Sequence, residues 1–233
     1  MNIPEEFDGF LICPGYSRKQ INQFKRIFAM DNLNHISKKE QYLQMRKYSN
    51  DNRSYSLDVR VNKELVGRFY IQIESVKLSI ETFRIINKKS EEMFREESFY
   101  GIKDENGLDR INNSIYGGFG SYEPYPTVTA KAAALWYKIA TNQFFNNGNK
   151  RTAMLSAIYL LAENYYTFDV KDVKRMYDIS LAAANNEINI KYIERFINGH
   201  VSLGYEHMEN TFENKDFDSF ISLEFKNSDS ILH

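Results

Sequence analysis

The sequence predicts a mostly α-helical protein with a small α+β segment at its N-terminus. Over residues 76–200, apolar residues recur at helical spacing almost without interruption. Earlier, residues 55–61 and 65–73 alternate between apolar and polar side chains in the manner of β-strands. The chain has 233 residues, 42% of them hydrophobic, which is enough to bury a sizeable core. We expect three parts: an α+β segment over 1–75, a helical domain over 76–200 and an acidic C-terminal tail over 201–233.

Composition limits the class of protein. The single Cys13 cannot form an internal disulfide, no apolar run reaches the roughly 18 residues of a membrane span, and residues 1–8 are acidic rather than signal-like. These features predict a cytoplasmic protein without a membrane partner. The net charge of −1 argues against a general nucleic-acid-coating protein.

Charge is nevertheless unevenly distributed along the chain. Residues 16–68 hold 12 Lys/Arg against 5 Asp/Glu, whereas residues 201–233 hold 2 against 7. Either these two segments dock on each other, or both are solvated faces.

Two short helices and a hairpin are predicted in the N-terminal segment. Ser17 with Gln20, and Ser37 with Glu40, each fit a capping box at a helix start. The apolar faces would consist of Ile21, Phe24, Ile27 and Phe28 in the first helix, and of Tyr42, Leu43 and Met45 in the second. Helix, turn, helix and hairpin in a basic segment resemble the order of a winged-helix DNA-binding domain. The alternative is an N-terminal elaboration of the main domain.

Five helices are predicted after position 76. The first is long and contains Leu78, Phe83, Ile86, Met93 and Phe94. The others cover 127–141, 149–164, 169–184 and 189–198, with Asp169 as an N-cap and Gly199 as a C′ residue. The glycine- and tyrosine-rich residues 116–125 predict a surface loop or a short hairpin. In the tail, Phe212, Phe217, Phe220 and Phe225 predict some packing.

The most informative segment is 143–152, which reads Gln-Phe-Phe-Asn-Asn-Gly-Asn-Lys-Arg-Thr. Its Gly-Asn-Lys-Arg run leads into an apolar helical pattern, so it places backbone N–H groups, a lysine and an arginine at a helix start. Such a helix start binds anions, and phosphate is the ligand we expect. Phe144 or Phe145 would anchor this loop in the core, while Asn146, Asn147 and Asn149 would face outward.

This segment resembles the signature of the Fic/Doc family, His-x-Phe-x-(Asp/Glu/Asn)-x-Asn-(Gly/Lys)-Arg. Flanking blocks strengthen the resemblance to the Doc-type branch over residues 76–200: Gly107-Leu108, Tyr125-Pro126-Thr127, Lys131-Ala132-Ala133-Ala134-Leu135 and Arg151-Thr152-Ala153. When the register is counted back from Arg151, Gln143 falls where the family has its catalytic His. The resemblance therefore implies a family domain that lacks this base.

The resemblance also implies a ligand and a set of site residues. ATP, or another purine nucleotide, would bind with Mg²⁺, its phosphates held by Gly148, Asn149, Lys150 and Arg151. Asn147 would help to hold the metal weakly, as a neutral ligand, so that the ion relies on the nucleotide's own oxygens. Residues aligned with the family's flap, onto which a target polypeptide adds as a strand, are Gly117, Gly118, Phe119 and Gly120; packing over the nucleotide is the alternative role for their segment.

Two departures favour a Doc-like kinase over an AMP transferase. Lys150 stands where the AMP-transferring branch usually has Gly, and Met154 stands where that branch has a second Arg. The donor's γ-phosphate would then pass to a protein hydroxyl, as in toxin–antitoxin systems, with restraint supplied in trans by an antitoxin-like inhibitor.

Gln143 has no pKa that would let it accept the hydroxyl proton near neutral pH, and His35, His200, His207 and His233 offer no evident substitute. Three hypotheses follow: a Doc-like phosphotransferase with weakened or lost activity, an inactive Fic-like binding protein, and a DNA-bound regulator. The last is suggested by the winged-helix-like order and the basic segment 16–68, but DNA is the disfavoured partner.

Overall fold

The computed structural model describes residues 5–50, 53–94, 99–118 and 122–212. The chain divides into two compact units. The N-terminal unit comprises Met1–Ser75, Asn164–Thr167 and Ser202–His233, and the helical unit comprises Val76–Glu163 and Phe168–Val201. Each unit has its own hydrophobic core.

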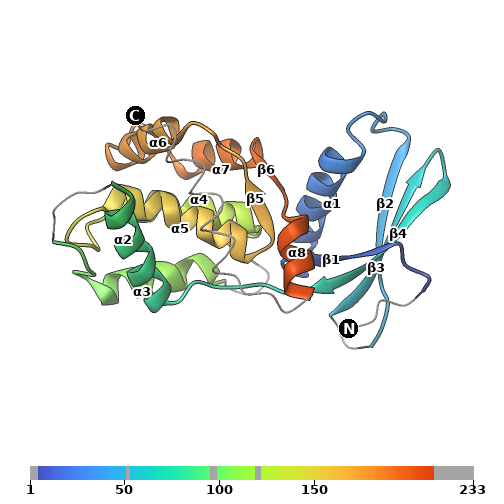
Figure 1. Cartoon of the computed structure of the whole chain (residues 1–233), viewed down its shortest axis with the longest axis horizontal. Helices are drawn as coiled ribbons and strands as arrows, with labels where there is room; N and C mark the ends of the chain where they lie inside the picture. The colour runs from blue at the N-terminus through green and yellow to red at the C-terminus, as the bar shows by residue number, and fades with distance from the viewer. Residues whose placement is uncertain (1–4, 51–52, 95–98, 119–121, 213–233) are drawn as a thin grey trace. The chain divides into compact units, whose positions relative to one another are not determined.

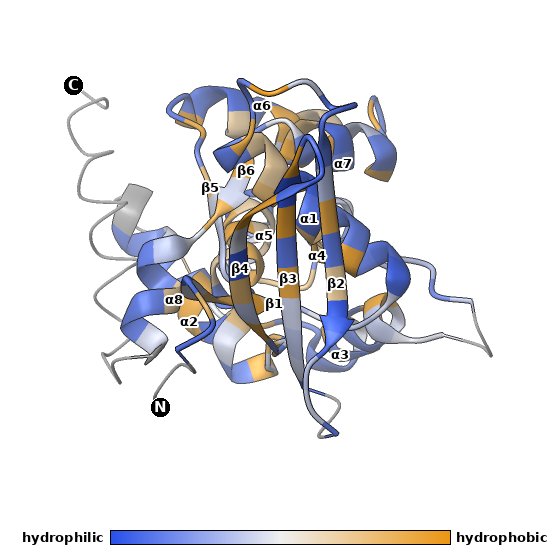
Figure 2. Cartoon of the chain, turned by 90° about the vertical axis from the view of Figure 1, so that its right-hand side faces the viewer, coloured by the Kyte–Doolittle hydropathy of each residue, from blue (hydrophilic) through white to orange (hydrophobic). Residues whose placement is uncertain are grey.

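A four-stranded sheet forms the centre of the N-terminal unit. The strands lie in the order β1-β4-β3-β2, with β1 parallel to β4 and the other pairs antiparallel. Their bounds are Gly9–Cys13 for β1, Gln41–Lys47 for β2, Ser54–Val61 for β3 and Glu64–Ile73 for β4. Figure 2 shows hydrophilic and hydrophobic residues in alternating bands along β2 and β3, as a sheet with two different faces requires.

The predicted hairpin is confirmed. Strands β3 and β4 are joined by Asn62 and Lys63, both with positive φ (51° and 74°). Two consecutive left-handed residues are typical of a type I′ turn, whose twist matches that of the strands it connects.

Helix α1, Arg18–Asn32, follows the sheet's first strand and is capped as predicted. Ser17 Oγ accepts a hydrogen bond from the Gln20 N–H at 3.2 Å. Phe24, Ile27 and Phe28 are buried, which confirms the predicted apolar face.

The second predicted helix is wrong. Its proposed apolar face lies in β2, where Leu43 is opposite Val59 and Met45 is opposite Leu57. Cross-strand pairing with a distant segment has overridden the local helical signal. The sequence interpretation also missed β1. The helix-turn-helix order of a winged helix is therefore absent from the described residues.

The helical unit confirms the mostly α fold class. Its helices are α2 Ile80–Phe94, α3 Glu105–Tyr116, α4 Val128–Ala140, α5 Asn149–Glu163, α6 Val173–Ala184 and α7 Ile190–Asn198 (Figure 1). Helix α5 packs against α4, α2 and α6. The largest side chain in the core of this unit is Trp136, which is fully buried and donates from Nε1 to Ser180 Oγ at 2.7 Å.

Several predicted details of these helices need correction. Helix α3 was not predicted, nor was α8, Tyr205–Phe212, in the predicted tail. Asp172 rather than Asp169 caps α6, because strand β5, Tyr166–Phe168, pairs with β6, Val201–Leu203, and the Asp169 N–H donates to the His200 carbonyl. Gly199 is the C-cap of α7 in right-handed conformation, not a left-handed C′ residue. Phe217, Phe220 and Phe225 lie outside the described residues.

Within the described part of the chain, no helix combines the length and apolar character that a membrane crossing needs.

Candidate anion-binding loop at the start of helix α5

The loop between α4 and α5 is fixed to the core by two aromatic side chains. Phe144 is 5% exposed and Phe145 is 1% exposed, so both act as the predicted anchor. The neighbouring Gln143 and Asn146 are exposed. The loop therefore combines a buried aromatic base with a polar outer surface.

A second segment supports the loop through backbone hydrogen bonds. The N–H groups of Lys103 and Asp104 donate to the Phe144 carbonyl at 2.7 and 3.1 Å. In the other direction, the Asn146 N–H donates to the Gly101 carbonyl at 2.9 Å. These bonds satisfy the loop's backbone and limit its movement.

Asn149 closes the loop on itself, which corrects the prediction that it faces outward. Its Oδ1 accepts from the Phe145 N–H at 2.9 Å, and its Nδ2 donates to the Phe145 carbonyl at 2.8 Å. The same Nδ2 donates to Gln143 Oε1 at 3.1 Å. Asn149 thus fixes both the backbone of the loop and the Gln143 side chain.

Gly148 occupies a position that only glycine fills without strain. Its φ is +75°, and a Cβ added there would lie 2.9 Å from Tyr100 Cε1 and 3.1 Å from Ser90 Oγ. The Gly148 carbonyl accepts from the Thr152 N–H at 2.8 Å, which begins the hydrogen-bond ladder of α5. The tight turn brings the chain directly into the helix start.

Replacing Gly148 by Ala is expected to destabilise the protein by roughly 1–3 kcal/mol, because the new methyl group meets both a left-handed backbone and Tyr100. Urea unfolding measures the change. Gly199→Ala is the matched control: its φ is −86° and its nearest non-neighbour atoms would be 3.6 Å away, so its effect should be close to zero. Equal losses for the two variants would contradict this account.

Asn87 on α2 connects the loop to the helical core, and the sequence interpretation missed it. Its Nδ2 donates to the Asn147 carbonyl at 3.0 Å and to Thr152 Oγ1 at 2.9 Å, while its Oδ1 accepts from the Gly101 N–H at 2.8 Å. Asn87 is 1% exposed. A signal was present, since Asn87 and Ser90 interrupt the apolar face of α2. Polar residues on a buried helix face need partners, and here the partners are the loop.

Two cations lie in the first turn of α5, which itself contains no acidic residue. Arg151 is 8% exposed and Lys150 is half-buried. Positive side chains beside the positive end of a helix dipole cost roughly 0.3–1 kcal/mol in the absence of an anion. The first N–H groups of a helix also have no carbonyl partner one turn earlier. The arrangement is suited to an anion with several oxygen atoms.

Asn147 offers the oxygen expected to approach a metal. Its Oδ1 already accepts from the Gly148 N–H at 2.6 Å, which leaves one lone-pair direction for another partner. Across the described ranges, no group of three or more His, Cys, Asp or Glu residues could hold a metal ion. The chemistry of this donor set fits a cation that arrives with its own oxygen ligands.

The predicted flap begins at the end of α3. Gly117 is the C-cap, and its N–H donates to the Asn113 carbonyl at 2.9 Å. A Cβ on Gly118 would lie 2.7 Å from the Tyr122 carbonyl oxygen, so this position too requires glycine. Phe119 and Gly120 lie outside the described residues. No hydrogen bond joins Gly117 or Gly118 to the described atoms of residues 143–150.

Lysines surround the base of this glycine-rich segment. Lys131 Nζ donates to the Tyr125 carbonyl at 2.7 Å and stands 5.8 Å from the centre of the Tyr116 ring. Lys138 Nζ donates to Ser114 Oγ at 3.0 Å. Burial lowers the pKa of Lys131, with the charge of Glu123 opposing the shift, and burial also lowers the pKa of Lys138. Additional negative charge nearby would therefore stabilise the charged form of both lysines.

Neither histidine that packs in a core belongs to this loop. His200 Nδ1 lies 2.8 Å from the Phe196 carbonyl, and its ring packs on Phe196 at the end of α7. His207 is buried and stacks on Tyr165 in the N-terminal unit. His35 is exposed, and His233 lies outside the described residues.

Comparison with known families finds a match that includes this loop. Residues 78–161 match the Fic/DOC family. The matched Fic/DOC segment extends from just before α2 into α5 and contains the whole of 143–152, so the resemblance is confirmed over these residues. It does not reach α6 and α7, which the sequence interpretation had included. No curated protein matches the chain.

Proposed function

We propose that the Fic/DOC segment is a nucleotide-binding transferase domain that acts on a protein hydroxyl, with activity weakened or lost because Gln143 replaces the His base. The observation that carries this proposal is the start of α5, where a rigid glycine turn, helix N–H groups, Lys150 and Arg151 converge. ATP, or another purine nucleotide, with Mg²⁺ is the ligand of this loop.

Phosphate binding is supported by how the loop is built. Asn149 and Asn87 use their side chains to hold the turn, so the site is formed before ligand arrives. A preformed site binds more tightly because little chain entropy is lost on binding. The phosphate charge would also offset the unfavourable placement of two cations at a helix start.

Asn147 is the residue that would contact Mg²⁺, and it supplies a single neutral oxygen. When bound, the ion would neutralise phosphate charge. The phosphates would therefore be oriented by the turn at Gly148, the first N–H groups of α5 and the two cations.

Gln143 can orient a target hydroxyl but cannot remove its proton. Its Oε1 is held by Asn149 Nδ2, which leaves the amide N–H₂ as the group that can meet a substrate oxygen. A general base contributes roughly 10²–10⁴-fold to rate, so the chain is a slow transferase or none.

The identity of the donor group follows from Lys150 and Met154. Met154 is 1% exposed in the core, so this position cannot contact a terminal phosphate as a second Arg would. This difference favours a Doc-like transfer of the γ-phosphate over transfer of AMP. The glycine-rich segment that starts at Gly117 would present the target polypeptide, and an antitoxin-like partner would restrain the site in trans.

Calorimetry with ATP and Mg²⁺ tests nucleotide binding. Arg151→Ala is expected to weaken binding by roughly 10- to 150-fold, since a charge-assisted hydrogen bond contributes about 1.5–3 kcal/mol. Lys191→Ala is the matched control, because Lys191 is an exposed cation in the first turn of another helix, α7, and its loss should leave the affinity unchanged.

Because Arg151 is buried, its variant must first be shown to be folded by its melting transition. An affinity unaffected by Arg151→Ala in folded protein would remove Arg151 from the site. No heat with the unchanged chain at saturating nucleotide would remove the proposal.

A second candidate function is favoured by Gln143 itself. Without a base, the domain would bind nucleotide or a partner protein and catalyse nothing. Label transfer separates the candidates: the unchanged chain should give slow transfer if it is an enzyme, and none above the Arg151→Ala background if it is a binding protein.

A further inference from the structure

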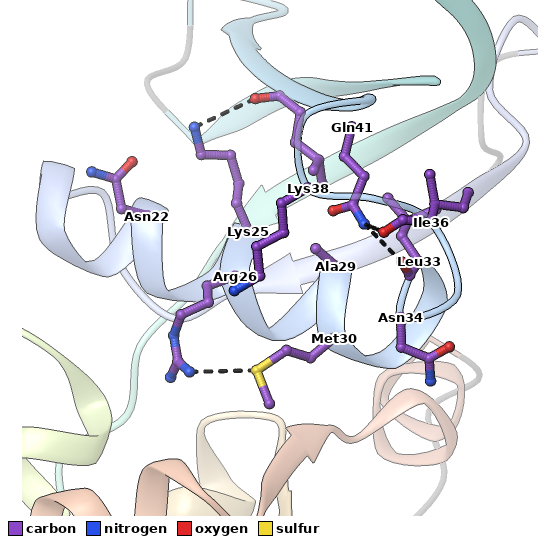
Figure 3. Close-up of a pocket in the computed structure, with 11 residues that line it drawn as sticks. Asn22, Lys25, Arg26, Ala29, Met30, Leu33, Asn34, Ile36, Lys38 and Gln41 are labelled. Carbon is purple, nitrogen blue, oxygen red and sulfur yellow. Dashed lines mark hydrogen bonds between the residues drawn. The ribbon is translucent and has the colours of Figure 1, made fainter. Parts of the chain in front are cut away.

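The N-terminal unit contains an apolar groove that no part of the proposed function uses. The groove has a volume of about 710 Å³ and lies between α1 and β2 (Figure 3). Its apolar surface comes from Ala29, Met30, Leu33, Ile36 and Leu43. Met30 is 45% exposed, so part of this apolar surface is in contact with solvent.

Cations and amides border this apolar surface. The remaining lining residues are Asn22, Lys25, Arg26, Asn34, Lys38 and Gln41, so none of the described carboxylates lines the groove. Lys25 Nζ donates to the Leu43 carbonyl at 3.5 Å, and Arg26 Nη1 donates to Met30 Sδ at 3.4 Å. An occupant with apolar side chains and negative charge would match the groove.

The groove adjoins an open sheet edge. Strand β2 is the last strand of the sheet, and among the described residues it pairs only with β3. The Asn62 N–H donates to the Glu40 carbonyl, and the Tyr48 N–H donates to the Ser54 carbonyl. The backbone N–H and C=O groups of even-numbered residues in β2 therefore point toward β3. Because this direction alternates along an antiparallel strand, the backbone groups of Leu43 and Met45 point toward the open edge.

An open edge beside an apolar groove is the arrangement used for strand addition. The edge supplies backbone hydrogen bonds, and the groove receives alternate side chains.

We propose that residues 217–225 of this chain bind here as a strand added to β2. Their sequence, Phe-Asp-Ser-Phe-Ile-Ser-Leu-Glu-Phe, alternates apolar and polar residues at its end, so that the proposed strand would carry Ile221, Leu223 and Phe225 on one face. Residues 213–233 carry five Asp/Glu against two Lys/Arg. This charge is complementary to Lys25, Arg26 and Lys38.

The length of the chain permits this docking. Tyr205, the first residue of α8, accepts a hydrogen bond from Asn32 at the end of α1, and the next residue, Leu33, lines the groove. Helix α8 has 8 residues and spans about 12 Å. Residues 213–216 join α8 to the proposed strand, and the five-residue step from Phe212 to Phe217 reaches roughly 17 Å when extended. This reach exceeds the length of α8, so the chain can return to the end of α1 beside the groove.

Cysteine cross-linking in the full chain tests the placement. Met30→Cys with Leu223→Cys should form an intramolecular disulfide under mild oxidation, which peptide mass spectrometry identifies. Cys13 does not interfere, because it is buried. The control pair, Val66→Cys with Leu223→Cys, uses a residue that is 57% exposed on β4 and should cross-link at least ten-fold more slowly. Equal rates for the two pairs, or disulfides between chains only, would overturn the proposal.

Amide hydrogen exchange gives a second measurement. Changing Ile221, Leu223 and Phe225 together to Asp should speed exchange at Leu43 and Met45 by at least ten-fold while Val59 in β3 stays protected. Continued protection of Val59 is the control that shows the sheet stays folded in this variant. Unchanged exchange at both edge amides would overturn the proposal, even if the cross-link forms.

Discussion

Replacing Gln143 by His is expected to raise the rate of phosphoryl transfer by roughly 10²–10⁴-fold, the usual contribution of a general base. The substitution places an imidazole in a loop that Phe144, Phe145 and Asn149 already hold rigid. The variant should transfer label from γ-labelled ATP to a protein in cell extract and should be toxic on expression. The unchanged chain should do neither, or far less.

Two controls define what a positive result means. Gln143→Ala should stay as inactive as the unchanged chain, because it also lacks a base. Gln143→His combined with Arg151→Ala should lose the gain, since phosphate binding would then fail. Label from α-labelled ATP would contradict the choice of γ-phosphate, and no label from either donor despite nucleotide binding would favour the binding-protein function.

Replacing Asn87 by Leu is expected to destabilise the protein by about 3 kcal/mol or more. The change removes three hydrogen bonds and leaves the Gly101 N–H and the Asn147 carbonyl in a partly buried setting without that partner. Each buried group left unsatisfied costs roughly 1–3 kcal/mol. Urea unfolding measures the loss, and nucleotide affinity should fall with it because the turn at Gly148 loses its support.

Asn113→Leu is the comparison variant for Asn87. Asn113 is exposed on α3, and its side chain bonds Lys77 and Asp109 at the surface. Surface changes of this kind usually alter stability by less than about 0.5 kcal/mol. A loss for Asn87→Leu no larger than that for Asn113→Leu would show that Asn87 does not hold the loop.

The elements predicted from sequence are those whose signal is local and strong. Helices α4 and α5 have long periodic runs, and α1 has its cap and buried face, so each was predicted within a few residues. The hairpin of β3 and β4 was found because alternation and turn lie within one short stretch. The buried phenylalanines of the loop followed from their position between two apolar helices.

The missed elements depend on contacts that are distant in sequence. Strand β2 is stabilised by β3, and β1 pairs with β4 some 60 residues later, so neither shows a decisive local pattern. Helix α3 is short, and its first turn contains Gly107, which weakens the helical signal.

In the candidate site, too, the residues with a local signal could be predicted and those with distant contacts could not. The segment from Gly148 to Arg151 could be predicted, because a helix start has local chemistry. Asn87 could not be assigned, since its contacts with Asn147 and Thr152 span 60 and 65 residues. The inward turn of Asn149 was missed because a side chain that caps its own loop looks, in sequence, like any exposed amide.

Amide hydrogen exchange at the start of α5, with and without ATP and Mg²⁺, tests the central claim most directly. Bound phosphate should slow exchange at Asn149, Lys150 and Arg151 by at least ten-fold, while the first turn of α7, at Lys191 and Tyr192, should not change. Folded protein whose α5 amides exchange at the same rate with saturating nucleotide would contradict the claim that this helix start binds phosphate.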